Sequence, residues 1–222
     1  MTLMTIQECE AYLEEVGMAT ILPSKDALLP CLLWQARGDR ERREVWDDAL
    51  DRAWRWKDDL PAAKKAWLGR LFGDRVVLLH RRLLPAFLAW RGRPNVRTLY
   101  QDGHLSREAF TVWSSIEGAD EPMGRAELRR AAGLAAREHA SRFDRACRDL
   151  EKRLLLTRAG RSAVASGWDA NSYMPVQDWF ADEWKAAQSW DPDEAREVVR
   201  EALEQAAPDA SARQLARWMR AL

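Results

Sequence analysis

Apolar residues recur every three or four positions through most of the chain, and this period predicts a mainly helical protein. Residues 39–61 show the pattern well, because charged residues fill the faces that the apolar stripe leaves open. The stripe consists of Val45, Ala49, Ala53 and Trp56. The expected structure of this segment is a half-buried helix.

Other helices are expected where the same period is bounded by start and stop residues. Thr5 and Glu8 have the spacing of a capping box at the start of the first one. Pro30 strains the second, Pro61 is expected to begin the third, and Pro85 interrupts or kinks the fourth. These helices are expected over residues 6–16, 24–37, 61–73 and 81–92.

Only short β-strands are expected. The run RVVLLH at residues 75–80 is apolar and β-branched, which is typical of a strand. RLLLTR at residues 153–158 and YMPVQ at residues 173–177 flank a Gly- and Ser-rich excursion, and together they predict a hairpin.

Residues 101–177 carry their elements in the order of a winged helix-turn-helix. A helix capped by Ser106 is followed by a short extended piece, a short helix that Gly133 ends, a longer helix and the hairpin. The predicted fold class is therefore mainly α with small β-hairpins. It combines this module with an N-terminal helical region.

A domain boundary is expected near residue 100, where Gly, Pro and polar residues cluster at 91–95 and 100–104. The apolar stripe of the last helix, Leu215, Trp218 and Leu222, is expected to be a core contact or the contact of a homodimer. The predicted units are an N-terminal helical domain with one short strand (1–100), the winged helix-turn-helix (101–177) and C-terminal helices that pack on the rest (178–222).

The chain has no net charge, but its charges are unevenly distributed. Residues 61–99 hold nine Lys and Arg against one acid, Asp74, and residues 125–161 hold eleven against five, giving net charges of +8 and +6. Residues 178–222 hold six against ten, a net charge of −4. Two basic blocks in a neutral protein favour a surface that faces a polyanion, with the first block holding phosphates. The alternative is that these charges neutralise one another across the fold.

A row of polar and basic side chains on the longer helix of the second module is the candidate DNA-binding site. At 100° per residue these side chains share one arc, away from the apolar arc around Phe143. Arginine can hold a phosphate or both major-groove acceptors of guanine. Arg129 is expected beside the flanking backbone, and Arg158 and Arg161 at the start of the wing. The row consists of Arg137, Ser141, Arg145, Arg148 and Lys152.

The alternative interpretation of this row is an ordinary solvated face. Asp144, Asp149 and Glu151 lie three or four residues from several of the basic side chains, close enough to pair with them. Trp168, in the Gly-Trp-Asp tip of the wing, is interpreted either as a wedge into DNA or as a side chain folded back on its own domain.

No catalytic signature is recognisable in the sequence. It contains no Gly-x-x-x-x-Gly-Lys-Ser/Thr loop, no Gly-x-Gly-x-x-Gly and no Gly-x-Ser-x-Gly. Its three His are isolated, and neither they nor its three Cys have the spacing of a zinc site. We therefore expect no catalytic residue, metal or cofactor. The odd number of Cys, and the lack of a signal peptide or an apolar run of membrane length, predict a cytoplasmic protein without a membrane partner.

Three stretches of the sequence resemble the AlkZ-related proteins: WRWKDDLPAAKKAWLGRLFG, then RVVLLHRRLLPAFLAW, then GRAELRRAAGL with SRFDRACRDLEKRLLLTRAG. These proteins are short relatives of the YcaQ-type winged-helix DNA glycosylases, which release alkylated or crosslinked bases. The resemblance covers residues 5–185 and implies tandem winged-helix modules, hence a diverged one within residues 1–100. The glycosylases carry a catalytic Gln-x-Gln or Gln-x-Asp element, and none of the seven Gln here has Gln or Asp two residues on. The resemblance thus implies a DNA-related role and carries over no catalytic residue.

The sequence as a whole predicts a non-catalytic winged-helix protein that binds double-stranded DNA in repair or transcription. One open alternative is a diverged DNA glycosylase that acts on alkylated bases through an unrecognised carboxylate. The other is a protein- or effector-interaction module with an indole-lined pocket. That pocket would be drawn from tryptophans that otherwise form the core: Trp34, Trp46, Trp54, Trp56, Trp67 and Trp90.

Overall fold

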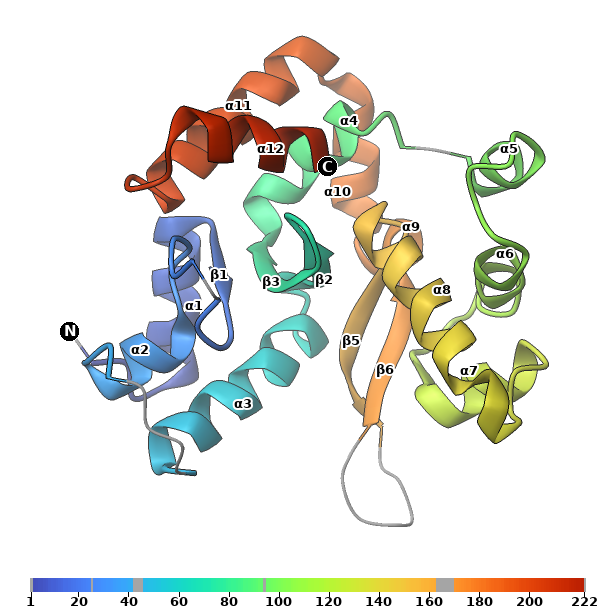
Figure 1. Cartoon of the computed structure of the whole chain (residues 1–222), viewed down its shortest axis with the longest axis horizontal. Helices are drawn as coiled ribbons and strands as arrows, with labels where there is room; N and C mark the ends of the chain where they lie inside the picture. Colours follow the sequence, from blue (N-terminus) through green and yellow to red (C-terminus); the bar gives the residue numbers. More distant parts are fainter. Residues whose placement is uncertain (1, 25, 42–45, 94, 163–169, 222) are drawn as a thin grey trace.

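The chain forms two similar halves that lie side by side, and the last two helices, α11 (Pro192–Ala206) and α12 (Ala212–Ala221), lie over the first half (Figure 1). This arrangement comes from a computed structural model, which describes residues 2–24, 26–41, 46–93, 95–162 and 170–221. The tip of the expected wing, with Trp168, lies outside the described residues, as does Val45.

The first half consists of helices around a small antiparallel sheet. Strand β3 is central in that sheet, because Leu79 pairs with Met18 on one side and with Trp67 on the other. The elements are α1 (Ile6–Val16), β1 (Met18–Thr20), α2 (Leu32–Arg37), α3 (Asp48–Ala62), β2 (Ala66–Leu71) and β3 (Arg75–His80).

The second half follows after η1 (Arg81–Leu83), α4 (Leu84–Trp90) and α5 (Val96–Gln101). Its central strand is β6, in which Tyr173 pairs with Met123 of one neighbour and Arg158 of the other. The elements are α6 (Arg107–Ser114), β4 (Met123–Gly124), α7 (Arg125–Ala131), η2 (Arg137–His139), α8 (Ala140–Lys152), β5 (Leu156–Ser162) and β6 (Ala170–Pro175).

The two halves repeat one plan. Each runs helix, strand, helix, helix and hairpin, and the strand orders β1-β3-β2 and β4-β6-β5 are the same. The single strand expected in residues 1–100 is therefore wrong, because β1, β2 and β3 all lie there. Two of these strands escaped detection because they are buried on both faces and show no alternation of apolar and polar residues.

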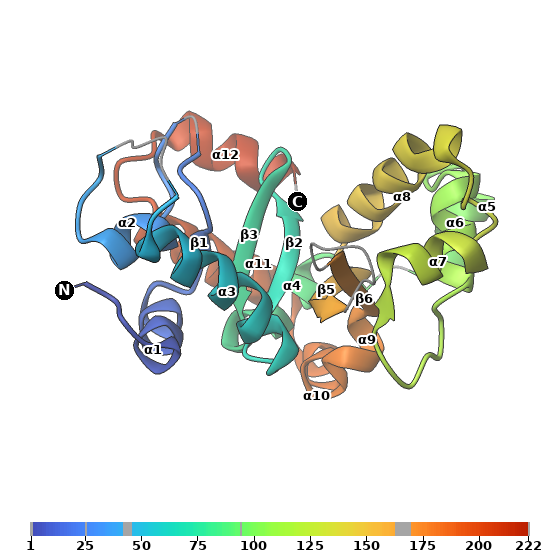
Figure 2. The same cartoon turned by 90° about the horizontal axis from the view of Figure 1, so that it is seen from below.

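Each half places its third helix on the hairpin of the other half. Helix α3 packs on β5, α8 packs on β2, and β2 and β5 are neighbours at the junction (Figures 1 and 2). The indole Nε1 of Trp67 in β2 donates to the Leu156 carbonyl in β5 at 3.2 Å. Nearby, the Leu68 N–H donates to Thr157 Oγ1 at 3.3 Å. The junction is thus a packed, hydrogen-bonded core.

The helix starts that the capping residues Thr5 and Ser106 predict are confirmed. Thr5 Oγ1 accepts a hydrogen bond from the Glu8 N–H at 3.2 Å, and the Glu8 carboxylate accepts one from the Thr5 N–H at 3.0 Å. Ser106 Oγ accepts one from the Ala109 N–H at 3.1 Å. These bonds satisfy N–H groups that have no partner within the helix.

The helix expected over residues 24–37 is wrong for its first part, because α2 begins only at Leu32. The Pro30 carbonyl instead accepts the Thr20 N–H at 2.8 Å, and Cys31 bridges to Thr20. This segment therefore runs beside β1. Pro30, which would break a helix, here lies just outside one.

The helix expected over residues 61–73 is also wrong. Pro61 lies in the last turn of α3, Lys64 turns the chain with φ 55°, and the following segment is β2. Pairing with β3 along all of β2 outweighs its local helical preference. Pro85 does not kink a longer helix either. It lies in the first turn of α4, where its missing N–H breaks no helical bond.

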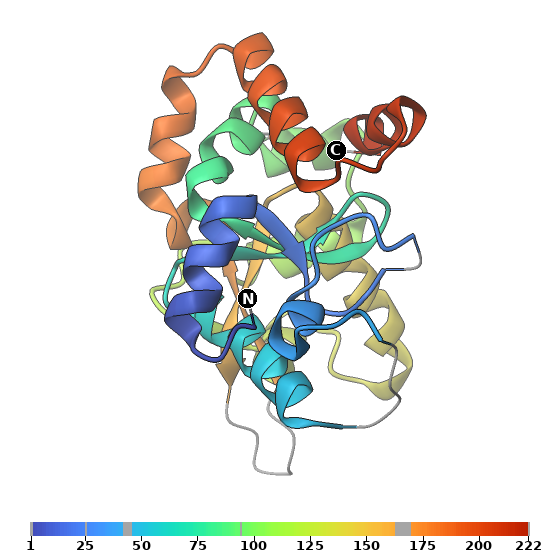
Figure 3. The same cartoon turned by 90° about the vertical axis from the view of Figure 1, so that its left-hand side faces the viewer.

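The C-terminal helices cover α4 and the β2–β3 hairpin (Figure 3). The Trp218 side chain is buried, and its ring centre lies 5.6 Å from that of Phe72, so this residue of the predicted apolar stripe contributes to the core. Leu222 of the same stripe lies outside the described residues. No helix within the described ranges is long and apolar enough to cross a bilayer. The elements are α9 (Val176–Trp179), α10 (Ala181–Ala186), η3 (Ala187–Ser189), α11 (Pro192–Ala206) and α12 (Ala212–Ala221).

Candidate nucleic-acid interface

Helix α8 is anchored by its apolar face, as its periodicity predicts. Phe143, Ala146, Cys147 and Leu150 are buried, and α8 packs there against α6. Burial raises the pKa of the Cys147 thiol, which keeps it protonated and unreactive. Because the apolar face is fixed in the core, the orientation of the polar row is fixed as well.

The N-terminal part of the polar row faces solvent. Arg137 lies in the 3-10 turn η2, and Ser141 and Arg145 follow on α8; all three side chains are exposed. The 3-10 turn η2 leads directly into α8, which begins at Ala140. Two guanidinium groups and a hydroxyl are thus available to a ligand approaching this end of α8.

The C-terminal part of the row meets the first half of the chain. Lys152 Nζ lies 3.2 Å from Asp74 Oδ1, and Arg148 Nη1 lies 3.8 Å from Asp74 Oδ2. Arg148 also donates from Nε to the Asp144 carbonyl at 3.2 Å. Both basic side chains nevertheless remain about 40% exposed, at 41% and 42%.

A cavity of about 430 Å³ opens between the tip of the β2–β3 hairpin and α8. Three of the residues that line it carry positive charge and two are acids, one of which, Asp149, is paired with Arg153 at 3.1 Å. The lining consists of Asp74, Ser106, Arg145, Arg148, Asp149 and Lys152. This lining suits an anion of the size of a phosphate group.

Arg129 is engaged with the main chain rather than directed at solvent. Its guanidinium donates to the carbonyls of Leu134, Ala135 and Ala136 at 3.2, 3.1 and 2.8 Å. These bonds hold the turn between α7 and α8. Arg129 therefore orients the start of α8.

Arg158 forms a buried ion pair at the junction of the halves. Its Nε and Nη2 donate to the two carboxylate oxygens of Glu151 at 2.8 and 3.2 Å. The two side chains are 14% and 1% exposed, and Arg70 of β2 approaches the same carboxylate at 3.8 Å. Burial alone would lower the pKa of Arg158, but the charge of Glu151 outweighs it and raises that pKa. Arg158 thus remains charged.

Arg161 lies beside the carboxylates of α3. Its Nε is 3.5 Å from Asp58 Oδ2, and its Nη2 is 3.8 Å from Asp59 Oδ1. Asp58 is 2% exposed and also pairs with Lys57. Burial lowers the pKa of Lys57. Arg161 therefore joins β5 to α3 through charge.

The first basic block is largely matched by acids from other elements. Arg82 donates to the carbonyls of Glu14 and Glu15 at the end of α1, and Lys64 lies over the Trp179 ring. These two contacts involve no opposite charge, whereas the ion pairs of the block favour mutual neutralisation for residues 61–99. The ion pairs of its basic side chains within the described residues are Lys65 with Glu10, Arg70 with Asp74 and Glu151, Arg75 with Asp26, Arg81 with Glu183, and Arg97 with Glu117.

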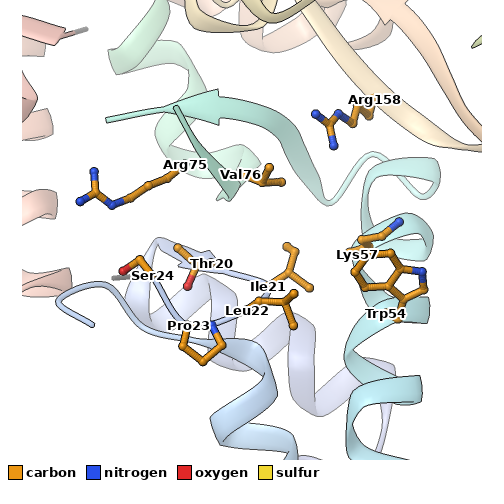
Figure 4. Close-up of a pocket in the computed structure, with 10 residues that line it drawn as sticks. All are labelled: Thr20, Ile21, Leu22, Pro23, Ser24, Trp54, Lys57, Arg75, Val76 and Arg158. Carbon is orange, nitrogen blue, oxygen red and sulfur yellow. The ribbon is translucent and has the colours of Figure 1, made fainter. Parts of the chain in front are cut away.

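A second cavity, of about 300 Å³, lies between β3, α3 and the segment after β1. Ile21 and Leu22 face Val76 across it, and Trp54 lies at one side, 38% exposed (Figure 4). Arg158 also reaches its rim. Among the described side chains that line it, none is a carboxylate. Elsewhere in the described chain, no three His, Cys, Asp or Glu side chains gather as a metal site would require.

A comparison with models of protein families shows which family the chain belongs to. A family model described as AlkZ related matches residues 3–220. The chain belongs to the AlkZ-related family. Comparisons with curated proteins and with solved structures give no match. The AlkZ-related match spans both halves and the C-terminal helices, so it includes every element that forms the junction.

Sequence reasoning missed two features of this AlkZ-related chain. The first is Asp74, which lies beside the basic row. The sequence feature that could have indicated it is that Asp74 is the one acid of residues 61–99. The small cavity gave no signal, because Trp54 and Val76 come from different elements. Of the tryptophans proposed for a pocket, Trp34, Trp56 and Trp67 are buried in the core.

Proposed function

We propose that this AlkZ-related chain is a non-catalytic, tandem winged-helix protein that binds duplex DNA, with α8 in the major groove. The observation that carries the proposal is the exposed row of Arg137 in η2 and Ser141 and Arg145 on α8, the third helix of the second half. In helix-turn-helix modules this helix reads base edges, and a major groove is wide enough to admit it.

The repeated plan of the two halves supports the winged-helix assignment. In each half a hairpin follows the third helix, in the position of the wing, and its last strand is central in the sheet. We retain the division into residues 1–100, 101–177 and 178–222. Helix α3 then corresponds to α8, and each wing-type hairpin supports the other module.

The side chains of the proposed site divide into two roles. Arg145, Arg148 and Lys152 line the cavity beside α8 and would bind backbone phosphates there. Arg129, Arg158 and Arg161 are engaged with carbonyls or carboxylates, and we propose that they position α8 and β5.

Binding of a random DNA duplex should weaken steeply with salt. Four cations of α8 and η2 that neutralise four phosphates give a slope of log affinity against log salt of about −3 to −4, because each contact releases counterions. Between about 50 and 200 mM salt the affinity should fall roughly 100-fold. Fluorescence anisotropy with a labelled duplex measures this.

A slope near zero, or no binding at about 50 mM salt, would refute the proposed DNA site. The non-catalytic part is tested with the same protein on alkylated duplex. Release of free base above the rate of a buffer control would contradict it and favour the glycosylase alternative.

A second candidate function, effector binding, is favoured by the cavity beside Trp54. Its wall is mainly apolar, and its Arg75 and Arg158 are already paired with acids, so it suits an uncharged aromatic group. The uncharged dye N-phenyl-1-naphthylamine is a suitable probe. Trp54→Ala should weaken dye binding about tenfold, since one buried indole face contributes roughly 1–2 kcal/mol.

Trp46→Ala is the matched control, because Trp46 contacts Trp54 at 6.3 Å between ring centres and is itself 54% exposed. Its effect on dye binding should be below about twofold. Equal effects of the two substitutions would show that the dye binds the surface rather than the cavity.

A further inference from the structure

The turn between β2 and β3 presents one carboxylate to α8 from a constrained backbone. Phe72, Gly73 and Asp74 form this turn with φ of 51°, 79° and 89°. Three successive positive φ values, two of them at residues with a side chain, are unusual and fix the direction of the turn. Arg70 Nη1 adds a bond to the Asp74 carbonyl at 2.9 Å. The main chain thus fixes the direction in which the Asp74 side chain leaves the turn.

The carboxylate of Asp74 lies among cations of the polar row. Lys152 is 3.2 Å from Oδ1, and Arg148 is 3.8 Å from Oδ2. Arg70 of its own hairpin lies 3.6 Å from Oδ2. Two of these three cations are those that would bind backbone phosphates in the proposed function.

We infer that Asp74 occupies a phosphate subsite of α8 and acts as an intramolecular competitor of nucleic acid. The inference rests on the proposed function and names a regulator of the same site. A DNA phosphate that enters the cavity of about 430 Å³ replaces the Asp74 carboxylate on Arg148 and Lys152. The hairpin of one half thereby sets the affinity of the helix of the other.

The contacts of Asp74 suit a competitor that can be displaced. Its side chain is 40% exposed, and ion pairs at this exposure are weak because water screens them. Oδ1 is itself buried and accepts no hydrogen bond from the part of the chain that the structure describes, although Lys152 is near. A phosphate offers more acceptor oxygens, so it satisfies the Arg148 fork and the Lys152 ammonium better.

Asp74→Asn tests the inference directly. Asparagine keeps the shape of the side chain and is among the residues that best tolerate positive φ. Affinity for a random duplex at about 100 mM salt should rise about 5- to 10-fold, because two competing ion pairs are removed. The salt slope should stay near its wild-type value, because the same four phosphates are contacted in both proteins. Anisotropy titrations at several salt concentrations give both values.

Asp149→Asn is the matched control. It removes the same charge from the same cavity, but Asp149 pairs with Arg153 at 3.1 Å, outside the polar row. Its effect on affinity should stay below about twofold. An equal gain in both variants would show that only the net charge matters, and would overturn the competitor role while leaving DNA binding intact.

Two further variants keep the test decisive. Asp74→Gly removes the carboxylate and also accommodates the positive φ, so it should reproduce the gain of Asp74→Asn. Placed in a Lys152→Met background, Asp74→Asn should lose most of its gain, because Arg148 is then the remaining cation of the pair. An undiminished gain in that background, or no gain in either Asp74 variant of a wild-type chain that binds DNA, would overturn the inference. Absence of binding by all of the proteins, the wild type included, would instead refute the proposed function.

Discussion

Replacing Glu151 by glutamine should destabilise the protein by about 3–5 kcal/mol, the usual cost of leaving one member of a buried ion pair without its partner. Glu151 is 1% exposed, and Arg158, which keeps its charge, is 14% exposed. The pair also joins α8 to β5 at the junction, where Arg70 of β2 approaches. Urea unfolding of the two proteins gives the difference in free energy of unfolding.

Glu204→Gln on α11 provides the matched control. Its carboxylate accepts from Arg200 at 2.7 Å, but both side chains are more than 40% exposed, so the change should be below about 1 kcal/mol. The double replacement Glu151→Leu with Arg158→Met should recover most of the lost stability, because it removes both buried charges. If Glu151→Gln unfolds within about 1 kcal/mol of the wild type, the pair does not hold the junction together.

The double variant Arg145→Ala/Arg148→Ala should lose at least about 30-fold in affinity for duplex DNA. Each arginine that contacts a base or phosphate contributes about 1–3 kcal/mol, and the two lie one turn apart on the same face of α8. Arg145 is exposed, and Arg148 has only the weak pair with Asp74 and one bond to the Asp144 carbonyl. The fold should therefore survive the change. Anisotropy at about 50 mM salt, with the melting temperature measured alongside, tests both expectations.

Arg196→Ala/Arg200→Ala makes the same change in charge on α11 and serves as the control. That pair lies on a helix that packs against α4, outside the proposed site. Its effect on DNA affinity should be below about twofold. If both double variants lose affinity equally, binding follows total charge, and α8 is not the reading helix.

Local signals in the sequence were sufficient for most of the second half. Ser106 as an N-cap, Gly133 as a stop and the apolar arc of α8 are each defined within a few residues, and the structure places them as expected. The first half was harder, because β2 is buried on both faces and carries no alternation. Its strand character comes from pairing with β3 along its whole length, and its burial comes in part from β5, which lies far away in the sequence.

The face of the candidate site was predictable, but its electrostatic partners were not. Helical geometry alone placed Ser141, Arg145 and Arg148 on one arc. The acids that meet the basic side chains come from distant segments: Asp74 meets Lys152 across 78 positions, and Asp58 meets Arg161 across 103. Such pairings follow from the packing of the two halves, which no local pattern encodes.

The reciprocal contact between the halves is the contact that a symmetric pair of identical subunits makes, with the same surface used twice. Here the two copies are covalently linked, so neither has to match its partner residue by residue. The exposed face of α3 carries Trp54, whereas the matching helix α8 carries Ser141 and Arg145. A scaffold that uses one plan twice lets the exposed faces of these two helices carry different side chains. The two helices can differ in this way because their halves belong to one covalent chain.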